Sequence, residues 1–281
     1  MKSAAEWKVF YARERASLGD VGLTQRLDRA PHVELRQGEA LVFPHTMMAA
    51  TGHLTAAVAR AVVRSGADEV LALGVLHGGR EQDAKQVKLA RAGDPVALGS
   101  LRRVHAAEAP LCAEEFSLDH FDALLALESA REGRKPPRVV ARYPFLVGDD
   151  LMRLPGLDDV MRLAERMPFV ATTDPLHHGA GYGTPEGERR AEHDETTLAF
   201  ARLSIQKQLD LLMDAKWAEF QQLAALVRSD FRDTGPVLAR ALPGGTERRG
   251  EILELLLVDY AEVLGAAPPT WVAGPLMRIA A

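Results

Sequence analysis

A strand–helix–strand pattern in the first third of the chain most constrains its fold. The apolar run LVFP at 41–44 predicts a strand, and 49–65 (AATGHLTAAVARAVVRS) predicts a helix because its alanines and apolar residues recur at helical spacing. Gly66 is expected to end that helix, and EVLALGV at 69–75 predicts a second, buried strand. Such a unit normally pairs its strands in parallel through a right-handed crossover.

The remaining chain continues this alternation. Further strands are expected at 138–147, 168–173 and 270–279, and further helices at 118–128, 151–167, 191–227 and 248–265. Residues 81–118 show weak periodicity and predict loops and short strands. Together these elements predict an α/β protein with a three-layer αβα architecture around a central, mostly parallel or mixed sheet. No repeat or low-complexity linker interrupts the pattern, so we expect a single domain over residues 1–281.

Composition excludes several classes of partner and location. The net charge is −5 and no basic stripe is present, which argues against nucleic acid as a partner. No apolar run has the length needed to cross a bilayer, and the N-terminal segment lacks the apolar core of a signal peptide. The lone Cys112 forms no internal disulfide, which fits a reducing compartment. We therefore expect a cytoplasmic protein without a membrane partner, and a homodimer is the commonest oligomer open to it.

Three histidines lie directly after predicted strands. His45 follows LVFP, His77 follows EVLALGVL, and His177 comes shortly after PFVATT, with Asp174 between. The carboxyl ends of strands in open α/β sheets converge on one crevice, where ligands usually bind. Neutral imidazole is a common ligand of zinc, iron and copper. This pattern predicts that the three histidines share one metal site.

The other histidines and motifs carry less information. We interpret His32, His105 and His193 as solvated and His53 as structural, while the sequence barely separates His178 from its neighbour. No phosphate-binding loop is present, which argues against nucleotide binding. No Gly-x-Ser-x-Gly elbow is present either, which argues against a serine hydrolase.

Four segments occur in the order found in Memo-like proteins, and the chain resembles that family over roughly residues 40–180. They are FPHTMMAATGHLTAAVARAVVRSGADEVLALGVLHGG, SLDHFDALL, YPFLVGDD and ATTDPLHHGAGYG. The resemblance places His45 and His77 on the family's first two metal positions. It also matches an acidic–histidine segment through Asp119, His120 and Asp122, and a later motif through Asp174, His177 and Gly179.

Memo-like proteins share their fold with class III extradiol dioxygenases (the LigB-type, or protocatechuate 4,5-dioxygenase type). Those enzymes bind Fe(II) through two histidines and one glutamate and use a further histidine as acid and base. The resemblance thus implies His45 and His77 as metal ligands and His177, oriented by Asp174, as the catalytic histidine. It implies that His120 lines the pocket, where it would stabilise bound oxygen or an oxyanion.

The third metal ligand is where this chain departs from the Memo-like pattern. No cysteine follows Cys112, so the family's C-terminal cysteine ligand is absent. The glycine-rich turn and helix of the dioxygenases resemble PGGTERRGEILELLLVDYAEVLGA, which points to Glu251. Asp230 and Asp233 in SDFRDTG are the alternatives, and Glu251 could instead be a first-turn carboxylate facing a helix dipole. A carboxylate in this place favours Fe(II), with zinc or manganese as other possibilities.

We therefore expect a non-haem, metal-dependent dioxygenase that cleaves a small aromatic diol of the catechol type. Three alternatives stay open, and one of them is an interaction protein whose metal site has decayed. The other two keep the metal. One is a Memo-like metal-binding or redox protein without ring-cleavage activity. The other is a metal-assisted hydrolase, for which Asp174, His177 and a bound metal would suffice.

Overall fold

A mixed sheet forms the centre of the computed structural model, which describes residues 4–148, 150–243 and 248–280. In the described residues the sheet has 8 strands in the order β3-β4-β2-β5-β1-β8-β6, and β7 pairs with β8. The strands are β1 (Ala40–Phe43), β2 (Glu69–Leu73), β3 (Arg103–Ala106), β4 (Arg138–Phe145), β5 (Phe169–Thr172), β6 (Leu176–Gly179), β7 (Arg249–Asp259) and β8 (Thr270–Ala280).

The inner strands of this sheet are parallel. β4, β2, β5 and β1 run side by side in the same direction, so their carboxyl ends meet at one edge. β3 and β8 run antiparallel to β4 and β1, and both β6 and β7 pair with β8 in the antiparallel sense. The sheet is thus mixed around a parallel core, as the strand–helix–strand unit predicts.

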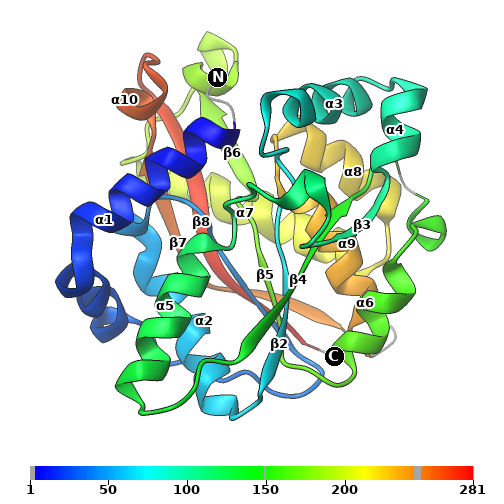
Figure 1. The fold of residues 1–281 in the computed structure, drawn as a ribbon. Coiled ribbons are helices and arrows are strands. Elements are labelled where there is room, and N and C mark those ends of the chain that lie inside the picture. Colours follow the sequence, from blue (N-terminus) through cyan, green and yellow to red (C-terminus); the bar gives the residue numbers. More distant parts are fainter. Residues whose placement is uncertain (1–3, 149, 244–247, 281) are drawn as a thin grey trace.

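Helices cover both faces of the sheet, which confirms the three-layer αβα architecture (Figure 1). One layer contains α1 (Ala4–Arg29), α2 (Met48–Ser65), α3 (Glu81–Arg91), α4 (Pro95–Leu101) and α5 (Asp119–Arg131). The other contains α6 (Leu157–Ala164), α7 (Glu195–Met213), α8 (Trp217–Leu226) and α9 (Phe231–Ala241). The short α10 (Ala261–Leu264) precedes β8. Within the described residues, none of these helices has the length and apolar character that spanning a bilayer requires.

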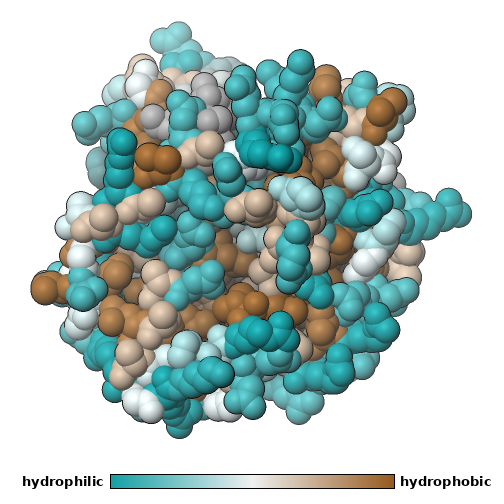
Figure 2. Space-filling model, in the orientation of Figure 1, coloured by the Kyte–Doolittle hydropathy of each residue, from teal (hydrophilic) through white to brown (hydrophobic). Residues whose placement is uncertain are grey.

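Alternating side chains of the strands build two separate cores. Val42 and Leu73 pack with the α6–α9 layer, whereas Leu41 and Val70 pack with the α1–α5 layer. Because both faces are covered, the inner strands read as continuous apolar runs instead of alternating ones. Figure 2 shows brown hydrophobic residues across the middle of one face, over α5 and β4, with hydrophilic residues around them.

The helix that follows β1 is held at both ends. At its C-terminus Gly66 adopts the left-handed conformation (φ 72°), as expected from the sequence. At its N-terminus the residue before the helix provides no side-chain cap, and the side chain of Glu14 from α1 caps the helix instead. The Glu14 carboxylate accepts hydrogen bonds from the backbone N–H groups of Met48 (3.0 Å) and Ala49 (2.8 Å). This anchor fixes α1 against α2 beside the carboxyl end of β1.

Several regions differ from the sequence-based expectation. The single helix expected at 191–227, for example, is divided into α7 and α8. Residues 81–118 contain a short strand, β3, as expected, but also the helices α3 and α4 where loops were expected. In α3 only Asp83 and Ala90 are buried, so the helix lacks the apolar stripe by which helices are predicted.

The expected helix at 248–265 is mostly the edge strand β7. Its buried residues Ile252, Leu255 and Val258 recur at every third position, which imitates helical spacing. An irregularity in the pairing with β8 between Ile252 and Glu254 disturbs the two-residue period of the strand. The glycine-rich turn expected before it, at 244–247, lies outside the described residues.

Candidate metal centre

The loops after three adjacent strands carry the predicted histidines and acidic group to one place. His45 follows β1, His77 follows β2 and Asp174 follows β5, and these strands neighbour one another in the sheet. The imidazole rings of His45 and His77 lie 5.4 Å apart between centroids. The expectation that strand-end residues meet at the carboxyl edge of the sheet is confirmed.

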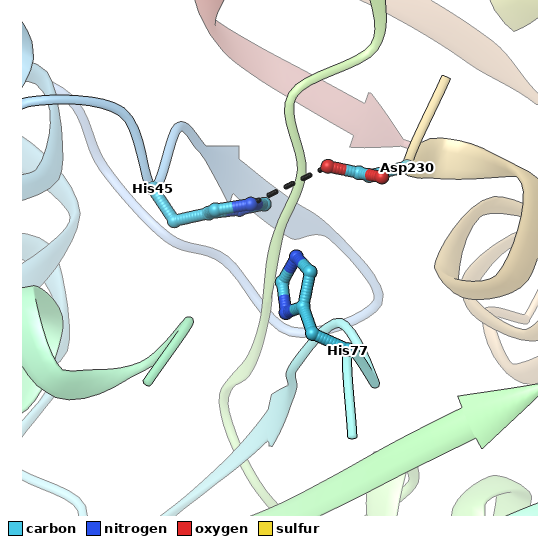
Figure 3. A group of neighbouring side chains, drawn as sticks. All are labelled: His45, His77 and Asp230. Carbon is cyan, nitrogen blue, oxygen red and sulfur yellow. Dashed lines mark ion pairs between the residues drawn. The ribbon is translucent and has the colours of Figure 1, made fainter. Parts of the chain in front are cut away.

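A carboxylate from outside the sheet completes this group. Asp230, in the turn between α8 and α9, places its Oδ2 3.5 Å from Nε2 of His45. One donor atom each from His45, His77 and Asp230 lies within 4.8 Å of the others. Figure 3 shows His77 pointing into the space between His45 and Asp230. Two imidazoles and one carboxylate on one side of an ion leave other coordination positions open.

Hydrogen bonds at Nδ1 define the tautomer of His45. Its Nδ1 lies 3.2 Å from the hydroxyl oxygen of Thr172, and that hydroxyl donates its own hydrogen to the carbonyl of Phe43 (3.0 Å). The Thr172 hydroxyl oxygen can therefore only accept a hydrogen bond from Nδ1 of His45, so the hydrogen of the neutral His45 ring is on Nδ1. The lone pair on Nε2 then faces Asp230, as metal ligation requires.

A buried carboxylate orients His77 in the same way. Glu115 lies 3.2 Å from Nδ1 of His77 and also accepts the backbone N–H groups of His77 (2.7 Å) and Gly78 (2.6 Å). Burial lowers the pKa of His77, but this hydrogen bond and the charges of Glu115 and Asp230 outweigh it and leave the pKa raised. A carboxylate behind a ligating histidine fixes the ring and strengthens it as a ligand.

His177 also presents its Nε2 to the carboxylate of Asp230. Its Nδ1 donates to the carbonyl of Arg228 (2.7 Å), and its Nε2 lies 3.7 Å from Oδ2 of Asp230. Arg228 has a left-handed backbone (φ 55°), which is uncommon for a residue with a side chain and costs about 1 kcal/mol. The predicted orienting partner was Asp174; the structure assigns that role to the Arg228 carbonyl.

Asp174 instead supports the loop after β1. Its carboxylate accepts the backbone N–H of His45 (3.2 Å) and reaches Nε2 of the same residue (3.5 Å). Burial and the neighbouring charge of Asp230 raise the pKa of Asp174. Burial would raise the pKa of Asp230 as well. The charges of the surrounding histidines and a hydrogen bond with His45 outweigh burial and hold this pKa well below the ordinary range. The pocket thus contains one firmly ionised carboxylate and one that readily takes a proton.

The preferred third ligand, Glu251, is in the wrong place. It is exposed on β7 and pairs with Arg278 of β8, which in turn pairs with Leu41 near the start of β1. Glu251 therefore lies toward the amino ends of the parallel strands, whereas the histidines follow their carboxyl ends. The prediction failed because it assumed a helix at this position.

Of the two alternatives, Asp230 reaches the site and Asp233 does not. Asp233 is buried, forms an ion pair with Arg91 and accepts the backbone N–H of Leu146 (2.8 Å). Its charge is therefore used to hold α9 to α3 and to the end of β4.

His120 does not line the pocket, contrary to the resemblance. It lies on α5 behind Tyr11, at 5.0 Å between ring centroids, and its Nδ1 accepts a hydrogen bond from Arg15 (3.1 Å). Burial, together with the charge of Arg15, lowers the pKa of His120 to about 3. Asp119 forms an ion pair with the same arginine (3.3 Å), and Asp122 is exposed. This segment joins α1 to α5 and is not part of the pocket lining.

The other histidines are placed as follows. His32 and His193 are exposed, as expected, but His105 is buried and bonded to the carbonyl of Leu101 (2.8 Å). His53 contacts Glu254 (3.2 Å), which fits its structural interpretation. The strand alternation of β6 turns His178 away from its neighbour, and it stacks on Trp271 at 4.7 Å.

A pocket with aromatic walls surrounds the candidate ligands. It has a volume of about 160 Å³, and its aromatic walls are Trp7, Tyr11, Phe116, Tyr182 and Tyr260. Phe116 stacks on His77 at 4.5 Å, and Tyr182 packs edge-on against His177 at 4.8 Å. A cavity of roughly 150 Å³ is large enough to hold a benzene ring. A larger cleft of about 1360 Å³ shares Trp7, His77 and Asp230 with this pocket and opens it toward α3.

The sequence matches no model of a known protein family, and a search of curated proteins finds no significant relative.

Proposed function

We propose that this protein is a non-haem metal enzyme that cleaves a small aromatic diol with dioxygen. The arrangement of His45, His77 and Asp230 is the observation that carries the proposal. Two histidines and one carboxylate with open positions are diagnostic of non-haem Fe(II) sites that bind substrate and oxygen together. Fe(II) is the preferred metal for this reaction, with manganese as an alternative. Zinc could occupy the same donors but has no redox chemistry with which to activate dioxygen. The ordered Memo-like motifs support the same class of protein.

The donor set fits a metal ion of this kind. All three imidazoles of the pocket have Nδ1 engaged, by Thr172, Glu115 and Arg228, and so direct Nε2 inward. When bound, Fe(II) would hold the diol and supply the activation of dioxygen, which the protein's own groups do not provide.

The protein's residues would bind the ring and move protons. Phe116 and Tyr182 offer aromatic surfaces beside the candidate ligands, and a planar ring between them would be held by stacking and edge contacts. The lone pair on Nε2 of His177 faces the pocket while its Nδ1–H is fixed by Arg228, so this imidazole can accept a proton from the diol and return it. Burial lowers the pKa of His177 and favours its neutral, proton-accepting form.

Oxygen uptake by the Fe(II)-loaded full chain tests this proposal. With catechol, we expect oxygen consumption in step with loss of the catechol absorbance. Asp230→Asn should abolish it, and the exposed variant Glu251→Gln should retain it. Failure of every catechol tested to stimulate oxygen uptake, with Fe(II) shown to be bound, would overturn the proposal.

Metal-assisted hydrolysis is the second candidate, and the position of Asp174 favours it. This carboxyl group lies 3.5 Å from Nε2 of His45, close enough to take a proton from a water molecule activated at the metal. Zinc-loaded protein would then hydrolyse esters or amides without oxygen, whereas the dioxygenase would be inactive with zinc.

A further inference from the structure

The pocket contains a second group of potential metal donors beside the first. One donor atom each from Asp174, His177 and Asp230 lies within 4.8 Å of the others. This group shares only Asp230 with the His45–His77–Asp230 group. Asp230 thus lies close to two histidines, with Nε2 of His45 at 3.5 Å and Nε2 of His177 at 3.7 Å from its Oδ2.

One ion is poorly suited to both groups at once. Ligand bonds of about 2.2 Å place two donors on opposite sides of an ion at most roughly 4.4 Å apart. The five residues form two groups, not a single one, under the wider limit of 4.8 Å. A carboxylate that bridges two ions about 3.5–4 Å apart is the usual solution for donors arranged in this way.

We propose that Asp174 and His177, with the shared Asp230, form a second divalent-cation site. Its residues are held in place before any ion binds. His177 is fixed by its bond to the Arg228 carbonyl (2.7 Å), and Asp174 by the backbone N–H of His45 (3.2 Å). Asp174 is only 3% exposed, and the side chain of His177 is 13% exposed. Such pre-ordering removes part of the entropic cost of binding.

The two sites differ in donor chemistry and therefore in metal preference. The first has two imidazoles and one carboxylate, which suits iron or zinc. The second has two carboxylates and one imidazole, which shifts the preference toward harder ions such as Mn²⁺. Repulsion between two cations that share one carboxylate makes the second ion bind more weakly than the first.

An ion in the second site would use the lone pair on Nε2 of His177. That imidazole would then no longer accept a proton from the substrate, so excess divalent metal should inhibit the reaction. This consequence rests on the proposed function, whereas occupancy of the second site does not.

Metal stoichiometry of the full chain tests the second site without reference to activity. Titration of the metal-free protein with Mn²⁺, followed by electron paramagnetic resonance of free and bound ion, should give two ions per chain. The second should bind at least tenfold more weakly, and the doubly loaded protein should show magnetic coupling between the ions. His177→Gln should bind one ion, with the first affinity changed less than threefold. Asp174→Asn should also bind one ion, but with a lower first affinity, because the Asp174 carboxylate also positions His45. His193→Gln, at an exposed histidine, should still bind two.

Two results would overturn the second site. One is a single ion per chain at saturating Mn²⁺, and the other is an unchanged stoichiometry in both Asp174→Asn and His177→Gln. Failure of the second site is separable from failure of the proposed function. Catechol cleavage by a protein with one ion per chain would refute the second site alone, and two ions without any catechol cleavage would refute the dioxygenase alone.

Discussion

Nε2 of His45 lies 3.5 Å from Oδ2 of Asp230, although the two residues are far apart in the sequence. His45 is placed by the parallel strand β1, and Asp230 by the turn between two helices of the other layer. Thr172, on the neighbouring strand β5, sets the tautomer that makes this pair a ligand set. The candidate metal centre thus combines residues from the sheet and from the α6–α9 layer at one edge of the sheet.

Removing the Asp230 carboxylate should weaken metal binding more than removing a residue that only orients a ligand. Outer residues that only orient a ligand typically contribute 10–100-fold to metal affinity, so loss of a ligand in Asp230→Asn should cost at least about 100-fold. Isothermal titration with Zn²⁺ measures this change. Glu251→Gln is the matched control and should bind as the wild type does; equal losses in both variants would contradict the assignment.

Replacing Glu115, which contacts the far ring nitrogen of His77, should lower the metal affinity of the site. In Glu115→Gln the charge beside Nδ1 of His77 is lost while the shape is kept, and we expect a 10–100-fold lower Zn²⁺ affinity. The buried backbone bonds of the same side chain predict a stability loss of about 1–3 kcal/mol, measured by urea unfolding of the metal-free protein. The exposed neighbour Glu114→Gln should change neither quantity.

His120 should make the fold sensitive to mild acid. Its pKa is about 3 in the folded protein, below the value of about 6.5 in an unfolded chain, so the unfolded state binds more protons between these pH values. Stability from this group is complete above pH 6.5 and falls as the pH drops toward 3. Between pH 7 and pH 5 the loss should be about 2 kcal/mol.

Urea unfolding at the two pH values measures this effect. His120→Asn, which keeps an acceptor for Arg15, should reduce the pH-dependent loss by about 2 kcal/mol. His193→Asn should leave it unchanged. The same pH dependence in His120→Asn and in the wild type would contradict the assignment of a neutral, buried His120.

Asp233 should prove structural. Removing one partner of a buried ion pair leaves the other charge without compensation, so Asp233→Ala should destabilise the protein by about 3–5 kcal/mol. Urea unfolding measures the loss, and the metal content of the folded variant should stay equal to that of the wild type. A variant that is fully stable but loses its metal would instead make Asp233 a ligand.

Much of this arrangement was predictable from local pattern. Apolar runs and the helix before Gly66 predicted the parallel core, and the position of His45 and His77 after strands predicted their meeting. The carboxylate ligand was harder to predict from the sequence, because Asp230 lies in a turn between helices. The position of that turn depends on the packing of the α6–α9 layer. Glu251 was indicated by the resemblance of its segment to the glycine-rich turn and helix of the dioxygenases, but residues 249–259 form the strand β7.

The supporting residues left no signal in the sequence. Glu115 acts through a loop that folds back on the end of β2, and Arg228 acts through its backbone carbonyl, which any residue carries. The left-handed conformation of Arg228 is set by tertiary structure, since this residue is neither a glycine nor an asparagine. Such partners are found only once distant segments are placed together.

Crystallographic location of a bound metal tests the central claim most directly. Crystals of the full chain grown with Zn²⁺ and measured at the zinc absorption edge should give an anomalous peak about 2.0–2.2 Å from Nε2 of His45, Nε2 of His77 and a carboxylate oxygen of Asp230. A peak bound through Nδ1 of either histidine, or a fully loaded protein whose zinc lies away from Asp230, would contradict it.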